Sequence, residues 1–144
     1  MQHTIELMKN KNQLQEKVVE FIKNADLYMD NFEFVDMDKI QLKSTDGDEK
    51  PEEKVLDIPE NIMDQFRLVS TYKGVHVPSM IFDSTGTKKI AAIASYVIEA
   101  LEQGRILVVD ELDSSIHFKL TRAIVAMFNN ELNTSAQMIF TVHD

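Results

Sequence analysis

The chain has 144 residues, 44% of them hydrophobic and 27% charged, which is enough for one ordinary globular domain with a core. It contains no cysteine, no apolar run near the roughly 20 residues that span a bilayer and no signal-peptide core, which excludes disulfides and fits a cytoplasmic protein without a membrane anchor. The formal net charge of −9 argues against nucleic-acid binding by this chain, because contacts to phosphates need Lys and Arg.

The first part of the chain is predicted to be helical. Apolar residues recur at helical spacing within residues 3–29, with Gln, Glu, Lys and Asn between them, and predict one amphipathic helix. Loose alternation of apolar and acidic residues over residues 32–42 predicts one or two short strands. Residues 44–60 are rich in acids and carry two prolines, which predicts a solvated loop.

The second part alternates between strands and helices. Residues 67–82 predict a β-hairpin that turns at Lys73 and Gly74. Apolar residues over 90–101 predict a second helix, which Gly104 ends. A fully buried strand at Ile106–Val109, a third helix and a second buried strand follow, the last two predicted at residues 120–128 and 137–142. This order predicts the α/β architecture of a doubly wound sheet.

Two adjacent carboxylates follow the first of these buried strands. Asp110 can hold a hydrated Mg²⁺ through its oxygens, and Glu111 can orient or deprotonate a water that attacks a phosphate. His143 follows the other strand, and both strand ends should open onto the same edge of the sheet, where ligands bind in such folds. Because many strands end in charged residues, the Asp-Glu pair alone is a weak signal.

A segment of hydroxyl residues, glycine and lysines stands just before the second helix. The simplest interpretation is that Ser84 or Thr87 caps this helix. Alternatively, free N–H groups, hydroxyls and the helix dipole bind an anion there, with Gly86 allowing a close approach and Lys88 and Lys89 adding positive charge.

The order of these motifs resembles that of ATP-binding cassette and SMC-like ATPases, and most closely that of bacterial AAA-family ATP-binding proteins of the phage abortive-infection type. DSTGTKK resembles their signature motif, ILVVDE the Walker B strand, LDSSIH the D-loop and TVHD the switch-histidine segment. The resemblance is strong over residues 84–144 and loose over the hairpin. Asp83 stands where the family usually carries Glu, and Thr85 replaces the first glycine of the signature.

The resemblance implies a fold and a set of cofactors. The fold is α/β, a partial P-loop NTPase (ABC-ATPase-like) sheet with flanking helices and a β-hairpin. Residues 84–144 would be the C-terminal half of a nucleotide-binding head, and residues 1–83 a helical and hairpin lead-in that includes the acidic loop 44–60. The cofactors would be ATP and Mg²⁺, held in a head-to-head dimer with a second copy or with an intact ATPase subunit.

The resemblance also implies roles for individual residues. Asp110, Glu111 and His143 would serve one ATP of the dimer, and the signature segment would cap the ATP of the opposite head. The implied residues are a metal-binding Asp110, a catalytic Glu111 and His143, a nucleotide-binding segment of Ser84, Thr85, Gly86, Thr87 and Lys88, and a D-loop with Asp113, Ser114, Ser115 and His117.

One motif of the resembled family is missing. A Walker A loop needs Gly-x-x-x-x-Gly-Lys-Ser/Thr, whose amides cradle the phosphates. None of the glycines, Gly47, Gly74, Gly86 and Gly104, begins such a run. The sequence therefore predicts a fragment or truncated product that binds ATP poorly and hydrolyses none by itself.

Two other functions stay open at this point. The chain can be a non-catalytic interaction module that pairs with an intact ATPase head and regulates it. It can also be a metal-dependent hydrolase or nuclease, since carboxylates and histidines bind transition metals. That second alternative leaves the signature-like helix start unexplained, and its candidate ligands are Asp110, Glu111, His117, His143 and Asp144.

Overall fold

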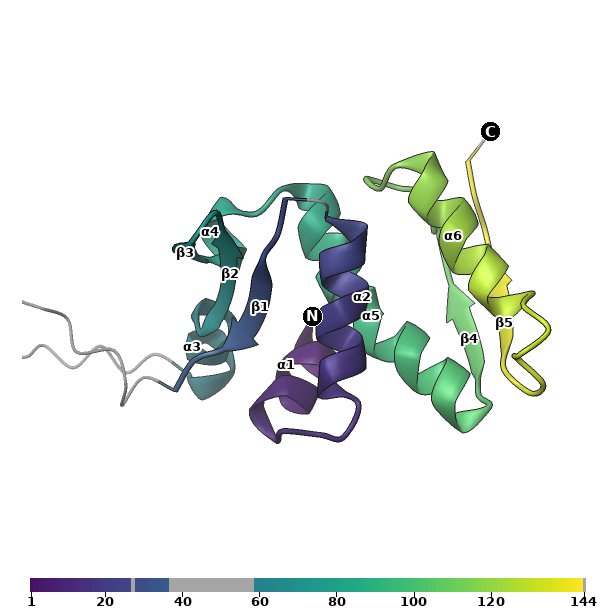
Figure 1. Ribbon diagram of the computed structural model, residues 1–144, viewed down its shortest axis with the longest axis horizontal. Coiled ribbons are helices and arrows are strands. Elements are labelled where there is room, and N and C mark those ends of the chain that lie inside the picture. Colours follow the sequence, from purple (N-terminus) through teal and green to yellow (C-terminus); the bar gives the residue numbers. More distant parts are fainter. Residues whose placement is uncertain (27, 37–58, 144) are drawn as a thin grey trace, which may run out of the picture.

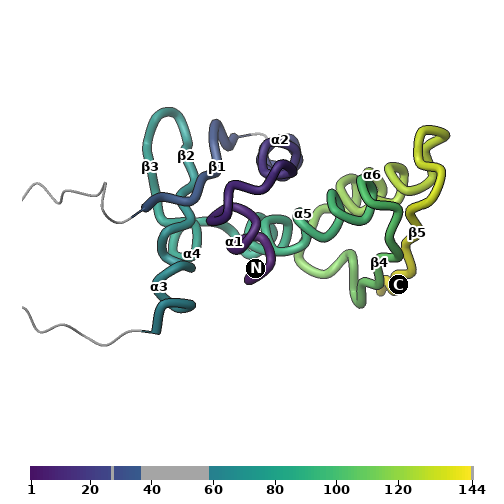
Figure 2. Tube along the Cα trace, turned by 90° about the horizontal axis from the view of Figure 1, so that it is seen from below, coloured from purple at the N-terminus to yellow at the C-terminus, as the bar shows by residue number. Residues whose placement is uncertain are grey.

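The computed structural model describes residues 1–26, 28–36 and 59–143. Two small sheets lie towards opposite ends of the long helix α5, with further helices packed between and around them (Figure 1, Figure 2). Within the described residues, no helix has the length and apolar character needed to cross a membrane. The elements in chain order are α1 (Gln2–Lys9), α2 (Gln15–Ala25), β1 (Asn31–Phe34), α3 (Glu60–Phe66), β2 (Leu68–Tyr72), β3 (Val75–Pro78), α4 (Ser79–Phe82), α5 (Thr85–Gln103), β4 (Ile106–Val109), α6 (Phe118–Phe128) and β5 (Gln137–Phe140).

The N-terminal helix predicted over residues 3–29 is wrong, because the chain forms two helices there, α1 and α2. Lys11 takes a left-handed backbone conformation with φ 47°, which ends the first helix. The side chain of Asn12 then accepts the N–H of Leu14 at 2.9 Å, a local bond that competes with helical hydrogen bonding. Helical spacing of apolar residues continued through this break, so the periodicity alone could not reveal it.

Helices α1 and α2 both pack against α5, which connects the two ends of the molecule (Figure 2). The hydroxyl of Thr4 on α1 donates to the carbonyl of Ala91 on α5 at 2.7 Å and lies 2.8 Å from the hydroxyl of Ser95. Phe21 and Ile22 of α2 belong to the same buried cluster. The lead-in and the C-terminal part of the chain therefore share one core.

The first sheet is antiparallel and has the order β1-β2-β3. The predicted hairpin is confirmed, and its turn residues Lys73 and Gly74 both have positive φ, as a tight hairpin turn requires. The strand predicted within 32–42 is confirmed as β1, and residues 37–42 lie outside the described residues.

Most of the predicted acidic loop 44–60 lies outside the described residues, and its last residue, Glu60, begins a helix, α3, that the sequence did not predict. The ammonium group of Lys9 on α1 pairs with the carboxylates of Glu60 at 2.7 Å and Asp64 at 2.8 Å. These ion pairs hold α3 beside α1. The short helix α4 was also not predicted.

The second sheet consists of β4 and β5, paired in parallel with Ile106 opposite Gln137. Parallel pairing brings their carboxyl ends to one edge, as predicted. The prediction of two fully buried strands is wrong, because Ile106, Val108 and Ile139 are 63%, 70% and 61% exposed. Only the opposite face is covered, with α6 lying on that side (Figure 1). A doubly wound sheet would be covered on both faces, and the described residues cover one.

Candidate functional site

The predicted signature segment forms the start of α5. Ser84 is the capping residue, because its hydroxyl accepts the N–H of Thr87 at 3.0 Å. Thr85 and Gly86 are the first two residues of the helix, and Lys88 follows within the first turns, partly exposed. Serine favours this position since its oxygen satisfies an amide that has no partner inside the helix. The cap orients the first turn whether or not a ligand binds there.

Asp83, just before the cap, is a buried carboxylate with three hydroxyl partners. It is 6% exposed. Its Oδ2 atom accepts hydrogen bonds from Ser70 and Ser79, both at 2.6 Å, and its Oδ1 atom accepts one from Tyr72 at 2.9 Å. Burial of a carboxylate is tolerated where donors satisfy it, as these do. Because the donors come from β2 and α4, Asp83 attaches the start of α5 to the hairpin.

A second carboxylate, Asp26 at the end of α2, holds the next residues of α5. The hydroxyl of Thr87 donates to Asp26 Oδ2 at 2.9 Å, and the Tyr72 hydroxyl lies 3.4 Å from the same oxygen. Tyr72 therefore stands between two carboxylates. Burial and then the hydrogen bond to Asp83 raise the pKa of the Tyr72 hydroxyl well above its ordinary value.

The raised pKa of Tyr72 predicts a loss of stability at alkaline pH. Above the ordinary tyrosine pKa of 10.0, the unfolded chain ionises at this residue while the folded chain does not, so the free energy of unfolding falls as pH rises towards the folded-state pKa. We expect the urea midpoint to fall from about pH 9 to about pH 11, and to fall less in Tyr72→Phe. If the urea midpoint fell equally with pH in the two proteins, the ionisation of Tyr72 would not be coupled to folding.

Thr141, a residue that the sequence motifs did not indicate, holds the Asp110 carboxylate and the backbone of Glu111 at the end of β4. The Thr141 hydroxyl accepts the N–H of Glu111 at 2.8 Å and donates to the carboxylate of Asp110. The N–H of Leu112 donates to the Thr141 carbonyl at 2.9 Å, which extends the pairing beyond the two strands. The sequence did carry a signal for this role, since Thr141 directly follows an apolar strand and stands two residues before His143.

The end of β5 brings a histidine to these carboxylates. His143 Nε2 lies 3.0 Å from Glu111 Oε1, and both side chains are exposed. The His143 N–H also points to the carboxylate of Asp113, at 3.2 Å. The structure thus brings Asp110, Glu111, Asp113 and His143 together at the carboxyl edge of the parallel strands.

The loop from Glu111 to His117 connects this edge to α6. The N–H of Ser114 donates to the Glu111 carbonyl at 3.1 Å and closes a turn. Leu112, which is buried, anchors the loop in the core. His117 lies at the far end, where its Nδ1 atom accepts the N–H of Lys119 at 3.2 Å and caps α6. This contact gives His117 a structural task separate from the carboxylates.

The start of α5 touches the same loop. A Cβ atom added to Gly86 would lie 2.6 Å from the carbonyl oxygen of Ser115, so only glycine fits this approach. Glycine is therefore required by packing within one chain, whatever binds at the helix start. The four segments that resemble the signature motif, the Walker B strand, the D-loop and the switch-histidine segment therefore lie next to one another in the structure.

Among residues 1–26, 28–36 and 59–143, no group of three or more His, Asp or Glu side chains is arranged to hold a metal ion. Asp144, one candidate ligand of the hydrolase alternative, lies outside the described residues.

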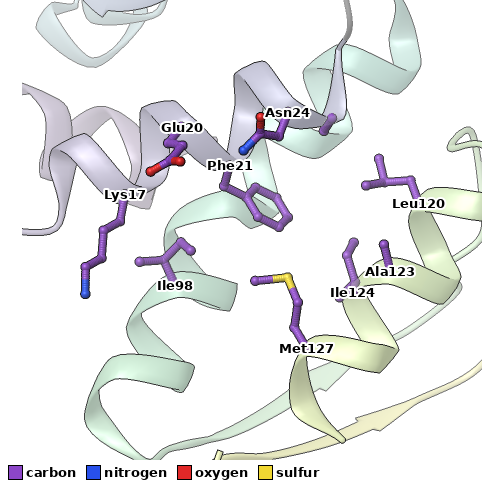
Figure 3. Close-up of a pocket in the computed structure, with 10 residues that line it drawn as sticks. Lys17, Glu20, Phe21, Asn24, Ile98, Leu120, Ala123, Ile124 and Met127 are labelled. Carbon is purple, nitrogen blue, oxygen red and sulfur yellow. The ribbon is translucent and has the colours of Figure 1, made fainter. Parts of the chain in front are cut away.

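An apolar groove of about 410 Å³ lies between α2, α5 and α6 (Figure 3). Phe21, Ile98, Ile124 and Met127 face it, and Lys17 lies at its rim on α2. None of the predicted site residues lines it. The groove and the carboxylate edge are thus separate features.

Comparison with known proteins identifies the class. Residues 4–144 match the model of a family of ATPase-type AAA domains. The family is described as "AAA domain, putative AbiEii toxin, Type IV TA system", and the chain belongs to it. No curated protein and no solved structure matches the chain. The match includes the N-terminal helices and the antiparallel sheet, so it is longer than the region of strong motif resemblance.

Proposed function

We propose that the chain is the C-terminal half of an ABC-type nucleotide-binding head from a cytoplasmic phage-defence ATPase. The observation that carries the proposal is the contact of Glu111 with His143 at the carboxyl edge of β4 and β5, beside Asp110. Membership of an AAA family supports an ATPase-type domain. AAA-type ATPase domains use nucleotide with Mg²⁺, and the proposal assigns both to this edge.

Each group at the edge has a chemical task in the proposal. Asp110 holds Mg²⁺ through its carboxylate, directly or through water, as Mg²⁺ sites commonly do. Glu111 orients and deprotonates the attacking water, and His143, 3.0 Å from it, contacts the γ-phosphate and keeps Glu111 in place. Thr141 links the carboxylate of Asp110 to the backbone of Glu111 through its hydroxyl.

The start of α5 serves a second nucleotide in the proposal. The first-turn amides, the Ser84 hydroxyl and Lys88 present partial and full positive charge to an anion. We propose that they cap the γ-phosphate held by the opposite subunit of a head-to-head dimer, formed with a second copy or with an intact ATPase head. The overall charge of −9 argues against nucleic acid as a ligand of this chain.

The free edge of β5 is where a phosphate-binding segment would complete the site. The N–H groups of Gln137 and Thr141 donate to the carbonyls of Arg105 and Val109, on the side of β4. Because neighbouring residues of a strand direct their backbone groups to opposite sides, the N–H and C=O groups of Met138 and Phe140 point away from β4. The exposed apolar face of this sheet lies next to that edge. In the proposal, the strand of a Walker A segment adds to β5 and the following helix covers the face, as parallel sheets require.

The proposal predicts that this chain alone does not turn over ATP, because the loop that cradles the phosphates is missing. The measurement is phosphate release by the purified 144 residues with ATP and Mg²⁺, beside Glu111→Gln. We expect both rates to equal the buffer blank. Turnover that Glu111→Gln abolishes would show that the chain is a complete enzyme and would overturn the proposal of a half site.

A second candidate function is a non-catalytic module that regulates an intact head. The exposed apolar face of β4 and β5 favours it, since such a face suits a protein partner. Titrating the chain into an intact family ATPase separates the two functions. A change in turnover that persists in Ser84→Arg favours regulation, whereas a change that Ser84→Arg removes favours the proposed signature role.

A further inference from the structure

Lys89 links the start of α5 to the carboxylate loop. Its Nζ atom donates to the backbone carbonyl of Glu111 at 2.5 Å. The same carbonyl accepts the N–H of Ser114 at 3.1 Å. Lys89 therefore contacts the backbone of the proposed catalytic base.

The backbone at Glu111 needs external support. Glu111 has φ 51°, a left-handed conformation that residues with a side chain adopt rarely and only where their surroundings enforce it. Thr141, just after β5, supports it at two points, since its hydroxyl accepts the N–H of Glu111 and its carbonyl accepts that of Leu112. Lys89 acts on the carbonyl of Glu111.

A second contact joins the same two segments. The absence of a side chain at Gly86 lets the first turn of α5 lie directly against the Ser115 carbonyl. Ser115 also has a positive φ, 65°. The helix start therefore touches the loop at two points, Ser115 and Glu111, and a shift of α5 along its axis must move both.

We propose that Lys89 is a positioning residue for Glu111. By holding the Glu111 carbonyl, it maintains the left-handed conformation that directs the carboxylate to His143. Lys89 and Gly86 together make the helix start and the carboxylate loop one mechanical unit. A phosphate captured at Ser84 is thereby coupled to the position of the base in the same chain. The proposal rests on the proposed function for the role of Glu111, whereas the contact itself is tested without turnover.

The test uses NMR on the full chain. We compare amide shifts and hydrogen exchange of Glu111, Leu112 and Ser114 in Lys89→Met, which keeps the side-chain stem, and Lys89→Arg, which keeps a donor. Loss of one hydrogen bond predicts roughly fivefold faster exchange of the Ser114 amide in Lys89→Met. Lys89→Arg should stay near the wild type.

Lys88→Met is the matched control, since the Lys88 side chain makes no hydrogen bond or ion pair within the described residues, and only its backbone N–H donates, to Ser84. Thermal melts check that all three variants fold. If Lys89→Met leaves the loop resonances and exchange rates as Lys88→Met does, the proposal is wrong. Turnover of ATP by the chain alone would overturn the proposed half site but would not change this result, so the two proposals fail separately.

Discussion

Replacement of Gly86 by alanine should destabilise the folded chain by about 1–3 kcal/mol, the usual cost of an added methyl in a tightly packed place. The new Cβ atom would lie 2.6 Å from the Ser115 carbonyl oxygen, a backbone atom that cannot rotate away. Alanine is favoured over glycine within a helix by roughly 1 kcal/mol, so a net loss means that the clash outweighs this gain. Urea unfolding followed by circular dichroism measures the difference.

Thr85→Ala is the control for that variant. It changes the neighbouring residue in the same turn, but Thr85 is exposed, and such surface changes are usually within about 0.5 kcal/mol. If Gly86→Ala were as stable as the wild type and left the Ser115 amide shifts unchanged, the helix start and the loop would not be in the contact described.

Replacement of Asp83 by asparagine should cost about 2–4 kcal/mol, since hydrogen bonds to charged groups are worth roughly 1.5–3 kcal/mol each. Asparagine keeps the shape of the side chain but replaces one acceptor oxygen by an NH₂ donor. Either Tyr72 or the two serines, Ser70 and Ser79, would then face a donor with their own hydroxyl hydrogens. The free energy of unfolding from urea titrations gives the value.

Asp30→Asn serves as the comparison for Asp83. Within the described residues, the Asp30 carboxylate accepts only the exposed N–H of Gly74, at 3.3 Å, so its replacement should have little effect. The double variant Asp83→Asn with Tyr72→Phe should lose less than the sum of the single losses, because the two share a hydrogen bond. A strictly additive result would contradict the network around Asp83.

Features determined by local chemistry were predictable from the sequence. Ser84 caps α5, Gly104 ends it in a left-handed conformation and Lys73-Gly74 makes the hairpin turn. Each depends on residues within a few positions along the chain. The arrival of His143 beside Glu111 was also predictable, because parallel strands separated by a helix bring their carboxyl ends together.

Features that depend on distant segments were not predictable. The carboxylate of Asp83 receives hydrogen bonds from β2 and α4, and that of Asp26 receives one from α5, so no single stretch of sequence shows the network. The exposure of Val108 was missed because apolar β-branched runs indicate a strand, while its burial depends on what covers each face. The left-handed conformation of Lys11 was also missed, because no glycine or proline near it indicated a break in the helix.

The most direct test of the proposed head uses an intact family ATPase whose own signature serine is replaced by arginine. Such a head keeps its Walker A and Walker B residues but cannot cap the nucleotide of its partner in its own dimer. Added to it, this chain should provide the missing signature through Ser84. The same addition with Ser84→Arg should provide none, and Thr134→Arg, on an exposed loop at the far end of α5 from Ser84, is the matched control.

The measurement is ATP turnover of the signature-deficient head with and without the chain. We expect the wild-type chain and Thr134→Arg to restore turnover and Ser84→Arg not to restore it. If turnover stays at the level of the deficient head with every form of the chain, while direct binding between the two proteins is observed, the proposed signature role of Ser84 is wrong.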